Sequence, residues 1–250
     1  MGVIWIDSGR FGRAWTPADI TTALWLDAAD AGTVTTVNSA VSQWNDKSGN
    51  NRHATQSTAG SRPGYSGGHI AFNGSTFLSC TPDWGPYWEW LLVAKFDRTD
   101  VTQVPIRDTG AAGATAIVGY ATNSTSFYRV RETENTAYST RIAVEFGTTR
   151  FIHGFSSRSS NTAFAFVNGS QKTSWGVTGI MGATLFFGTN VFNGGVVTPG
   201  LQGSISEFIL LSAEASDSTR QRIEGYLAHK WGLAANLPND HPYKSAAPTL

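Results

Sequence analysis

The chain is poor in charge and in cysteine. Only 14% of its 250 residues are Asp, Glu, Lys or Arg, against roughly 25% in an ordinary globular protein. Eighteen cationic side chains balance eighteen carboxylates, so the sequence lacks the cationic surplus that binding to nucleic acid or to an anionic membrane requires. Cys80 is the single cysteine, which excludes an intrachain disulfide and a cysteine-rich metal site.

The sequence also lacks a long apolar run. No stretch approaches the ~18 apolar residues of a membrane span. The apolar run at residues 3–6 is too short for the core of a signal peptide, and no basic residues precede it. We therefore expect a protein that is made in a cytosol, is not secreted by the classical route, and binds neither membrane nor nucleic acid.

Turn-forming and strand-forming residues are abundant. The 27 glycines, with many serines, threonines and asparagines, suit short strands joined by tight turns. Asn73-Gly74 and Asn168-Gly169 each lie between apolar stretches, a pattern typical of type I′ hairpins. Residues 88–96 alternate with both faces largely apolar, which predicts a strand covered on both sides. Further strands are expected at 115–120, 126–130, 141–145, 151–155, 184–188 and 204–211. So many short strands indicate a sandwich or a barrel.

One helix is expected near residues 218–231. Ser218 and Gln221 fit a capping box, in which the two side chains satisfy free backbone N–H groups at a helix start. Gly232 suits the left-handed residue that ends a helix. The apolar face is predicted to comprise Ile223, Tyr226, Leu227 and Trp231, with Trp231 as its largest buried side chain.

Residues 1–20 are predicted to form an N-terminal arm, and residues 21–250 the main domain. The arm is punctuated by glycine and proline and is too short to fold alone. Its apolar residues need burial, either against the protein's own domain or in another subunit. We predict docking through Val3, Ile4, Trp5 and Ile6.

Blocks of sequence point to a known domain family. WLDAAD at 25–30, WNDKSGNNRHATQ at 44–56 and IAFNG at 70–74 look like the opening of laminin G-like domains with the concanavalin A-like jelly-roll fold. FVNG at 166–169, FFG at 186–188 and GSISEFILL at 203–211 resemble the family's later strands. IEGYLAHKWGL at 223–233, with LP at 237–238 and HPYK at 241–244, is similar to the tail of the version common in bacteriophage and bacterial proteins.

This resemblance extends over residues 21–245. It implies an all-β, two-sheet antiparallel jelly-roll sandwich, concanavalin A-like, with one C-terminal helix and an N-terminal arm. IWIDSGRFG at 4–12 looks like the start of phage structural proteins that carry such domains. Together the resemblances imply a virion protein, in a capsid decoration or a tail or fibre. Its implied partners are other virion proteins, further copies of itself in the particle, and host-surface polysaccharide.

Catalytic patterns are missing from the sequence. Glycosidases of this fold place Glu, Asp and Glu at alternate positions of one strand, and no Glu-x-Asp-x-Glu occurs here. The strand carboxylates Glu89 and Glu207 are solitary. Cys80 has no local histidine, no Gly-x-Ser-x-Gly elbow is present, and the five histidines lack metal-ligand spacing. We therefore predict that the protein is not an enzyme.

The sequence predicts no cofactor, and a bound Ca²⁺ ion is the open alternative. Related lectin folds often hold Ca²⁺ with a carboxylate and loop carbonyls, and hard oxygen donors lie near the matching blocks. Asp and Asn before Ser-Gly are also ordinary turn formers. No metal ligand is assigned, and the donors concerned are Asp27, Asp30, Asn45 and Asp46.

Trp84 and Tyr87 are the candidate contacts for a glycan or a protein partner. They lie in a Gly/Pro-containing loop before the strand at 88–96, where an indole or phenol can stack on a sugar ring or anchor an interface. The alternative is that both pack on the domain's edge. The sequence thus predicts a non-enzymatic phage virion protein with a lectin-like domain. A bacterial carbohydrate-binding or adhesion module and a degenerate glycosidase remain the alternatives.

Overall fold

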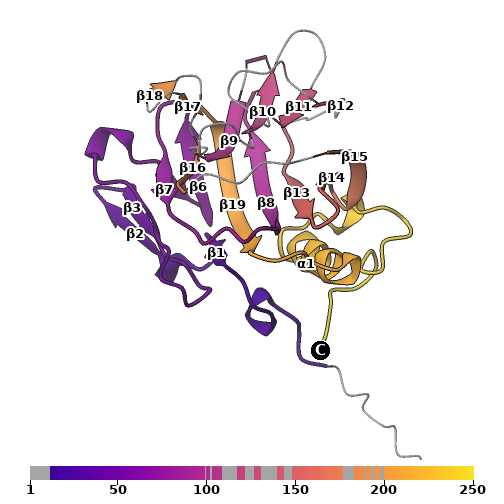
Figure 1. Ribbon diagram of the computed structural model, residues 1–250. Coiled ribbons are helices and arrows are strands. Elements are labelled where there is room, and N and C mark those ends of the chain that lie inside the picture. Colours follow the sequence, from indigo (N-terminus) through magenta and orange to yellow (C-terminus); the bar gives the residue numbers. More distant parts are fainter. Residues whose placement is uncertain are drawn as a thin grey trace, which may run out of the picture.

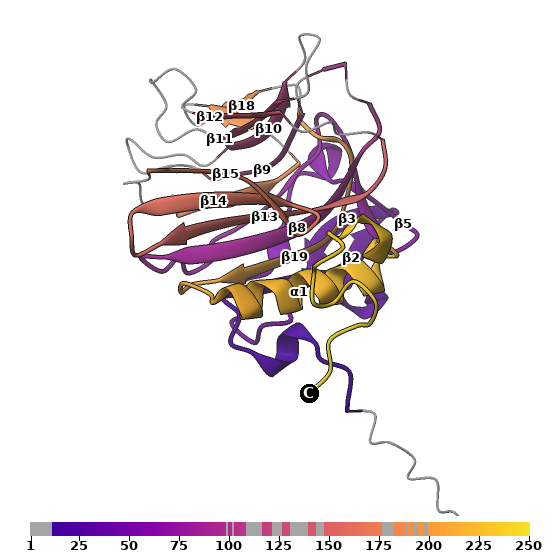
Figure 2. The same cartoon turned by 90° about the vertical axis from the view of Figure 1, so that its right-hand side faces the viewer.

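The computed structural model describes most of the chain, with gaps. The described residues are 12–98, 100–101, 103–108, 117–121, 127–130, 140–143, 148–176, 183–188, 190–192, 195–197 and 200–250. Over these ranges, no helix has the length and apolar character needed to span a bilayer. Strands are arranged in two layers, and one long helix lies against the outer face of one layer (Figure 1, Figure 2).

The first sheet is built around β19 (Gln202–Leu211). Its pairings are all antiparallel, and its register places β8 (Trp88–Phe96) on one side of β19. On the other side, the C-terminal half of β19 pairs with β1 (Leu24–Asp27) and the N-terminal half with β6 (His69–Asn73). The remaining members are β13 (Phe151–Arg158), β14 (Thr162–Val167) and β15 (Ser170–Gly176).

The second sheet is also antiparallel, and short strands join it to the first at one edge. Its strands are β7 (Leu78–Cys80), β16 (Leu185–Phe187), β9 (Gln103–Asp108), β10 (Ile117–Ala121), β11 (Phe127–Val130) and β12 (Thr140–Ala143). The joining strands are β2 (Val34–Val37), β3 (Ala40–Trp44), β4 (Ala54–Thr55) and β5 (Gly64–Ser66). β17 (Asn190–Phe192) and β18 (Gly195–Val197) form a separate pair.

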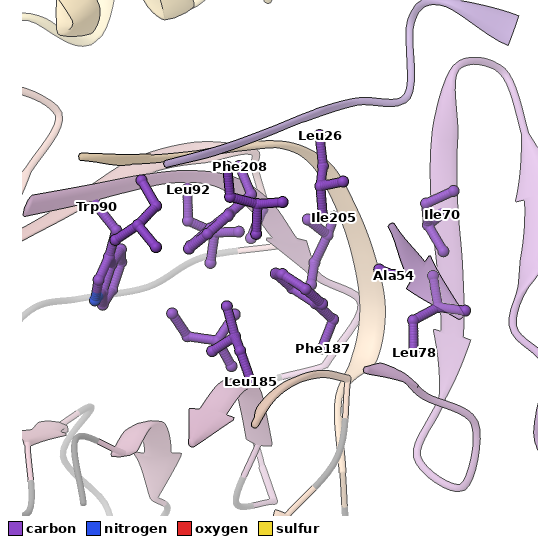
Figure 3. Close-up of a cluster of buried hydrophobic side chains, with 14 of the residues drawn as sticks. Leu26, Ala54, Ile70, Leu78, Trp90, Leu92, Leu185, Phe187, Ile205 and Phe208 are labelled. Atoms are coloured by element: carbon purple, nitrogen blue, oxygen red, sulfur yellow. The ribbon is translucent and has the colours of Figure 1, made fainter. Parts of the chain in front are cut away.

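The main core fills the space between the two sheets. Trp90 and Phe208 project from the first sheet, and Phe187 faces them from the second (Figure 3). The rings of Phe187 and Phe208 meet edge to face, with centroids 5.1 Å apart, a favoured arrangement for aromatic pairs. Alternate residues of β8, such as Leu91, lie in a second apolar cluster on the outer face. The prediction that residues 88–96 are covered on both sides is therefore confirmed.

The second apolar cluster is covered by the helix α1 (Asp217–Lys230). Its N-cap is Ser216, whose Oγ accepts a hydrogen bond from the backbone N–H of Thr219. The predicted capping box at Ser218 is wrong, because the helix begins before that residue. Gly232 has a φ of +70° and ends the helix as predicted. Short 3₁₀ turns lie at Pro17–Asp19, Ala31–Thr33, Ala59–Ser61 and Ala234–Asn236.

The two Asn-Gly pairs have different roles. Asn168 and Gly169, with φ of 49° and 78°, join β14 to β15 in the predicted hairpin. The hairpin predicted at Asn73 is wrong, because β6 pairs with β5 and β19 whereas β7 pairs with β4 and β16. The Asn73 side chain instead accepts hydrogen bonds from the backbone N–H groups of Ser75 and Thr76. This turn carries the chain from one sheet to the other.

The chain ends of the described structure meet beside α1. Residues 12–20 belong to the segment predicted as an arm, and Trp15 within it is only 2% exposed in the cluster under α1. Its backbone N–H donates to the carbonyl of Pro248, and Leu250 donates to the carbonyl of Arg13. The docking residues Val3, Ile4, Trp5 and Ile6 lie outside the described residues. Their partner therefore stays a prediction.

Candidate functional sites

The loop at residues 81–87 places the predicted contacts Trp84 and Tyr87 at an edge of the domain. Both side chains are half-buried. The Trp84 ring meets Trp88 edge-on, with centroids 5.6 Å apart, and also packs against the core between the sheets. Its Nε1 is buried without a hydrogen-bond partner. The loop is thus held on the domain while part of each aromatic side chain stays exposed.

A hollow of about 400 Å³ lies next to this loop, at the start of α1. Gly85 connects the two features, because a Cβ there would lie 1.7 Å from the backbone oxygen of Ser212, which lines the hollow. Only glycine permits so close an approach. Hydroxyl groups contribute much of the polar lining. The lining residues that carry them are Thr21, Ser212, Ser216 and Thr219.

A cluster of buried charges lies under the other end of α1, centred on Glu207. This carboxylate is fully buried, accepts three hydrogen bonds and forms an ion pair with Lys230. Oε1 accepts from Trp25 Nε1 at 2.8 Å and from the Tyr226 hydroxyl at 3.1 Å. Oε2 accepts from Trp231 Nε1 at 2.7 Å and lies 2.8 Å from Lys230 Nζ. Burial raises the pKa of Glu207, and Lys230 opposes that effect.

Two lysines neutralise the carboxylates of this cluster. Lys230 Nζ also lies 2.6 Å from Asp27, and Lys47 Nζ lies 3.0 Å from Asp27 and 2.9 Å from Asp30. Burial lowers the pKa of Lys47, but its hydrogen bonds with Asp30 and Asp27 outweigh burial and raise it overall. We call Asp27, Asp30, Lys47, Glu207 and Lys230 the charge cluster. It joins β1, β19 and the loop after β3 to the end of α1.

The oxygen donors considered for calcium are bound by the protein itself. Asp27 and Asp30 contact the lysines described above. Asp46 Oδ1 accepts hydrogen bonds from the backbone N–H groups of Trp25 and Ser48, and Asn45 Oδ1 accepts from a side-chain amide. Within the described ranges, no group of three or more His, Cys, Asp or Glu residues is placed to hold a metal ion. These residues fit hydrogen-bonded turns.

Glu89 and Cys80, two side chains considered for catalysis, are buried. Glu89 is 1% exposed, and neither of its carboxylate oxygens has a hydrogen-bond partner. Burial raises its pKa to about 8, so this side chain carries a proton at neutral pH. Burial also raises the pKa of the Cys80 thiol to about 12, which keeps it a thiol rather than a reactive thiolate.

No protein-family model and no curated protein matches the sequence. Solved structures match the fold. Botulinum neurotoxin type C, in a structure concerned with its interaction with two ganglioside molecules, superposes with a TM-score of 0.59 at 10% identity. The match covers 84% of this chain and 52% of that one. The chain thus spans about half the length of that toxin chain.

Enzymes share the same fold. Trypanosoma rangeli sialidase matches with a TM-score of 0.60 and 11% identity, over 84% of this chain and 33% of that one. A GH54 α-L-arabinofuranosidase matches with a TM-score of 0.57 and 10% identity, over 85% of this chain and 60% of that one. These similarities define a concanavalin A-like jelly-roll sandwich. They establish the fold alone, since one fold hosts many functions.

Proposed function

We propose that the chain is a non-enzymatic glycan-binding protein of a bacteriophage particle. In this proposal the jelly-roll domain binds host-surface glycan, and the N-terminal arm attaches the domain to other virion proteins. The observation that carries glycan binding is the loop at 81–87, which presents two partly exposed aromatic side chains next to an open hollow. The polar lining of the hollow consists of several hydroxyl groups and the side chain of Glu214.

This loop and hollow suit a neutral saccharide. Aromatic rings offer apolar area to the C–H faces of a sugar, while hydroxyl groups exchange hydrogen bonds with its hydroxyls. The similarity to a toxin structure concerned with ganglioside interaction is consistent with glycan binding in general. The balanced net charge of the sequence fits a neutral polymer better than a strongly charged one.

The proposal includes that the protein does not hydrolyse glycosidic bonds. Glycoside hydrolysis needs two carboxyl groups that reach opposite sides of the scissile bond, one of them protonated. In the described structure, Glu207 and Asp27 are buried and contact Lys230, and Glu89 is buried without a second carboxyl group within hydrogen-bond distance. These three carboxyl groups are therefore occupied or inaccessible to a sugar, and Glu214 is the single carboxylate among the residues that line the hollow.

The phage setting rests on the resemblance of residues 4–12 to the start of phage structural proteins and on the similarity of residues 223–244 to the tail of domains common in bacteriophage and bacterial proteins. Capsid decoration and tail or fibre are both compatible with it, and several copies are expected in one particle. A bacterial carbohydrate-binding or adhesion module is the alternative, and a degenerate glycosidase is the third. Mass spectrometry of purified particles tests the setting, since the protein is expected among the structural proteins in a fixed proportion.

A glycan array tests the binding proposal. The wild-type chain should bind a defined set of glycans, and Tyr87→Ala should reduce that signal at least tenfold with an unchanged melting temperature. Tyr65→Ala is the matched control, because Tyr65 is a half-buried tyrosine on β5, which pairs with β3 and β6 and not with the strand that follows the loop. Binding by no glycan, or equal binding by Tyr87→Ala and wild type, would contradict the proposal.

A further inference from the structure

The outer face of the first sheet is partly exposed beyond the end of α1. The helix ends at Lys230, and Gly232 turns the chain away. Beyond this point three neighbouring strands present Ala71, Ser204 and Lys95, each of which is partly or fully exposed. The register places Ser204 opposite both Ala71 and Lys95. Small side chains in the middle of this row leave a flat floor.

A β-bulge borders this floor. The register of β19 against β8 shifts between Ile205 and Glu207. As a result, Ser206 and Glu207 both reach the outer side: Glu207 contacts α1, and Ser206 Oγ lies 3.0 Å from His69 Nδ1. The bulge therefore fixes the His69 ring at the border, where its centroid lies 5.3 Å from that of Trp231. Bulges commonly redirect side chains next to functional sites.

The backbone of Arg150 directly precedes β13, on the far side of the floor from β6, and its side chain reaches His69 on β6. One of its nitrogens, Nη2, lies 2.8 Å from His69 Nε2, and its guanidinium carbon lies 5.7 Å from the centroid of the Trp231 ring. Because a guanidinium only donates, His69 Nε2 is the acceptor and Nδ1–H donates to Ser206. Arg150 is thereby held in one orientation by a neutral histidine and an indole.

Arg150 has no carboxylate partner in the described part of the chain. Arg62 and Arg222 have none there either, but Arg62 donates to backbone carbonyls and Arg222 to a tyrosine hydroxyl, whereas the polar partner of Arg150 is one nitrogen of a neutral histidine. Five other arginines each pair with a carboxylate: Arg13, Arg52, Arg98, Arg158 and Arg220. Burial lowers the pKa of Arg150, which reflects the energetic cost of holding an unpaired charge away from water. A bound anion would offset that cost.

The charges around His69 are cationic. Burial is the largest cause that lowers the pKa of His69, and the positive charges of Arg150 and Lys95 lower it further. Lys95 Nζ contacts Asp97 at 2.8 Å, so its charge is partly balanced, and Arg150 remains the principal unpaired cation. The positive field around His69 therefore coincides with a guanidinium whose buried Nε has no hydrogen-bond partner, at the border of the exposed floor.

We propose that Arg150, His69, Lys95 and the Ser204 floor form a second binding site, which takes the carboxylate of an acidic saccharide such as a sialic or uronic acid. The planar guanidinium matches a carboxylate with two parallel donors. The flat floor with its hydroxyl group accommodates a sugar ring beside that carboxylate. This site lies at the opposite end of α1 from the loop at 81–87 and is independent of the loop.

NMR titration of the full chain tests this site directly. The probes are N-acetylneuraminic acid and glucuronic acid, with their methyl esters, which keep the ring and lose the charge. The wild type should bind at least one acid, and its ester at least tenfold more weakly. Arg150→Gln should weaken binding of the acid at least tenfold, Arg150→Lys less, and Lys172→Gln, which removes an exposed lysine on β15, less than twofold.

Several outcomes would overturn the inference. These are no binding of either acid by the wild type, equal binding of acid and ester, an unchanged affinity in Arg150→Gln, or preferential binding of inorganic phosphate or an acidic peptide. Tyr87→Ala separates the two proposals. Loss of neutral-glycan binding in Tyr87→Ala without acid binding in the wild type retains the proposed function and rejects this site. Acid binding that survives Tyr87→Ala supports the site alone.

Discussion

Trp231 donates its indole N–H to the buried carboxylate of Glu207 over 2.7 Å. This hydrogen bond joins the end of α1 to β19 at the residue that follows the bulge. Trp231 was expected to be the largest buried side chain of the helix, but it is half-buried. Its role in stability thus depends on the hydrogen bond as well as on packing.

We predict that Trp231→Ala lowers the free energy of unfolding by about 3 kcal/mol, since it removes both packing and a hydrogen bond to a buried charge. Trp231→Phe keeps most of the packing and should cost about 1–2 kcal/mol. Trp84→Phe is the matched control, because the Trp84 N–H is buried without a partner and its loss carries no such penalty. Urea denaturation measures all three. A loss below about 1 kcal/mol for Trp231→Ala would contradict this role.

Lys230→Met should destabilise the protein by about 3 kcal/mol at pH 7, because it leaves two buried carboxylates without their shared ammonium group. Lys47→Met should cost less, since one of its two partners, Asp30, is 46% exposed. Loss of Lys230 raises the pKa of Glu207 further, so the variant recovers stability as the pH falls and that carboxylate takes up a proton. A pH-independent loss would argue against this account.

Glu89 should make the protein less stable at alkaline pH. Its pKa is raised from 4.5 to about 8 by burial, so its contribution to stability is full below pH 4.5 and is lost as the pH rises towards 8. Glu89→Gln removes this dependence, at up to about 1.4 kcal/mol per pH unit. The histidines titrate in the same pH range and contribute equally to both proteins. The difference in unfolding free energy between variant and wild type therefore reports on Glu89 alone. Parallel stability curves from pH 5 to pH 8 would show that Glu89 is ionised in the folded protein.

The N-terminal segment is expected to have two separable parts. Deletion of residues 2–11 should leave the melting temperature unchanged and abolish incorporation into particles. Deletion of residues 2–15 also removes Trp15, which is 2% exposed, and should cost about 3–5 kcal/mol. Mass spectrometry of particles assembled with each variant measures incorporation. Normal stoichiometry of the 2–11 deletion would exclude the arm as the attachment device.

The spacing of apolar residues predicted individual strands and helices well, because this spacing depends only on which faces of one strand or helix are buried. The alternation in β8 and the 3.6-residue period of α1 reflect the faces that each element buries. The turn at Asn73-Gly74 was misjudged because Asn and Gly permit a turn without specifying which strand follows. The partner of a strand depends on distant residues, and here the chain crosses to the other sheet.

The candidate sites depend even more on tertiary contacts. Asp27 was one of the oxygen donors considered for calcium, with no ligand assigned, whereas Lys47 and Lys230, distant from it in sequence, occupy its oxygens. Glu207 looked solitary in the sequence because its partners come from β1 and α1. Nothing local identified Arg150, which the structure places against a neutral histidine and an indole, with no carboxylate partner among the described residues. Such pairings become visible only once the strands are placed in register.

Equilibrium dialysis with the strongest glycan from the array tests the central claim, that this domain binds saccharide without cleaving it. Protein and oligosaccharide are held at neutral pH until equilibrium, and both chambers are analysed by mass spectrometry. We predict enrichment of the oligosaccharide in the protein chamber at its full mass. Equal concentrations in the two chambers, or fragments of the oligosaccharide, would contradict the account.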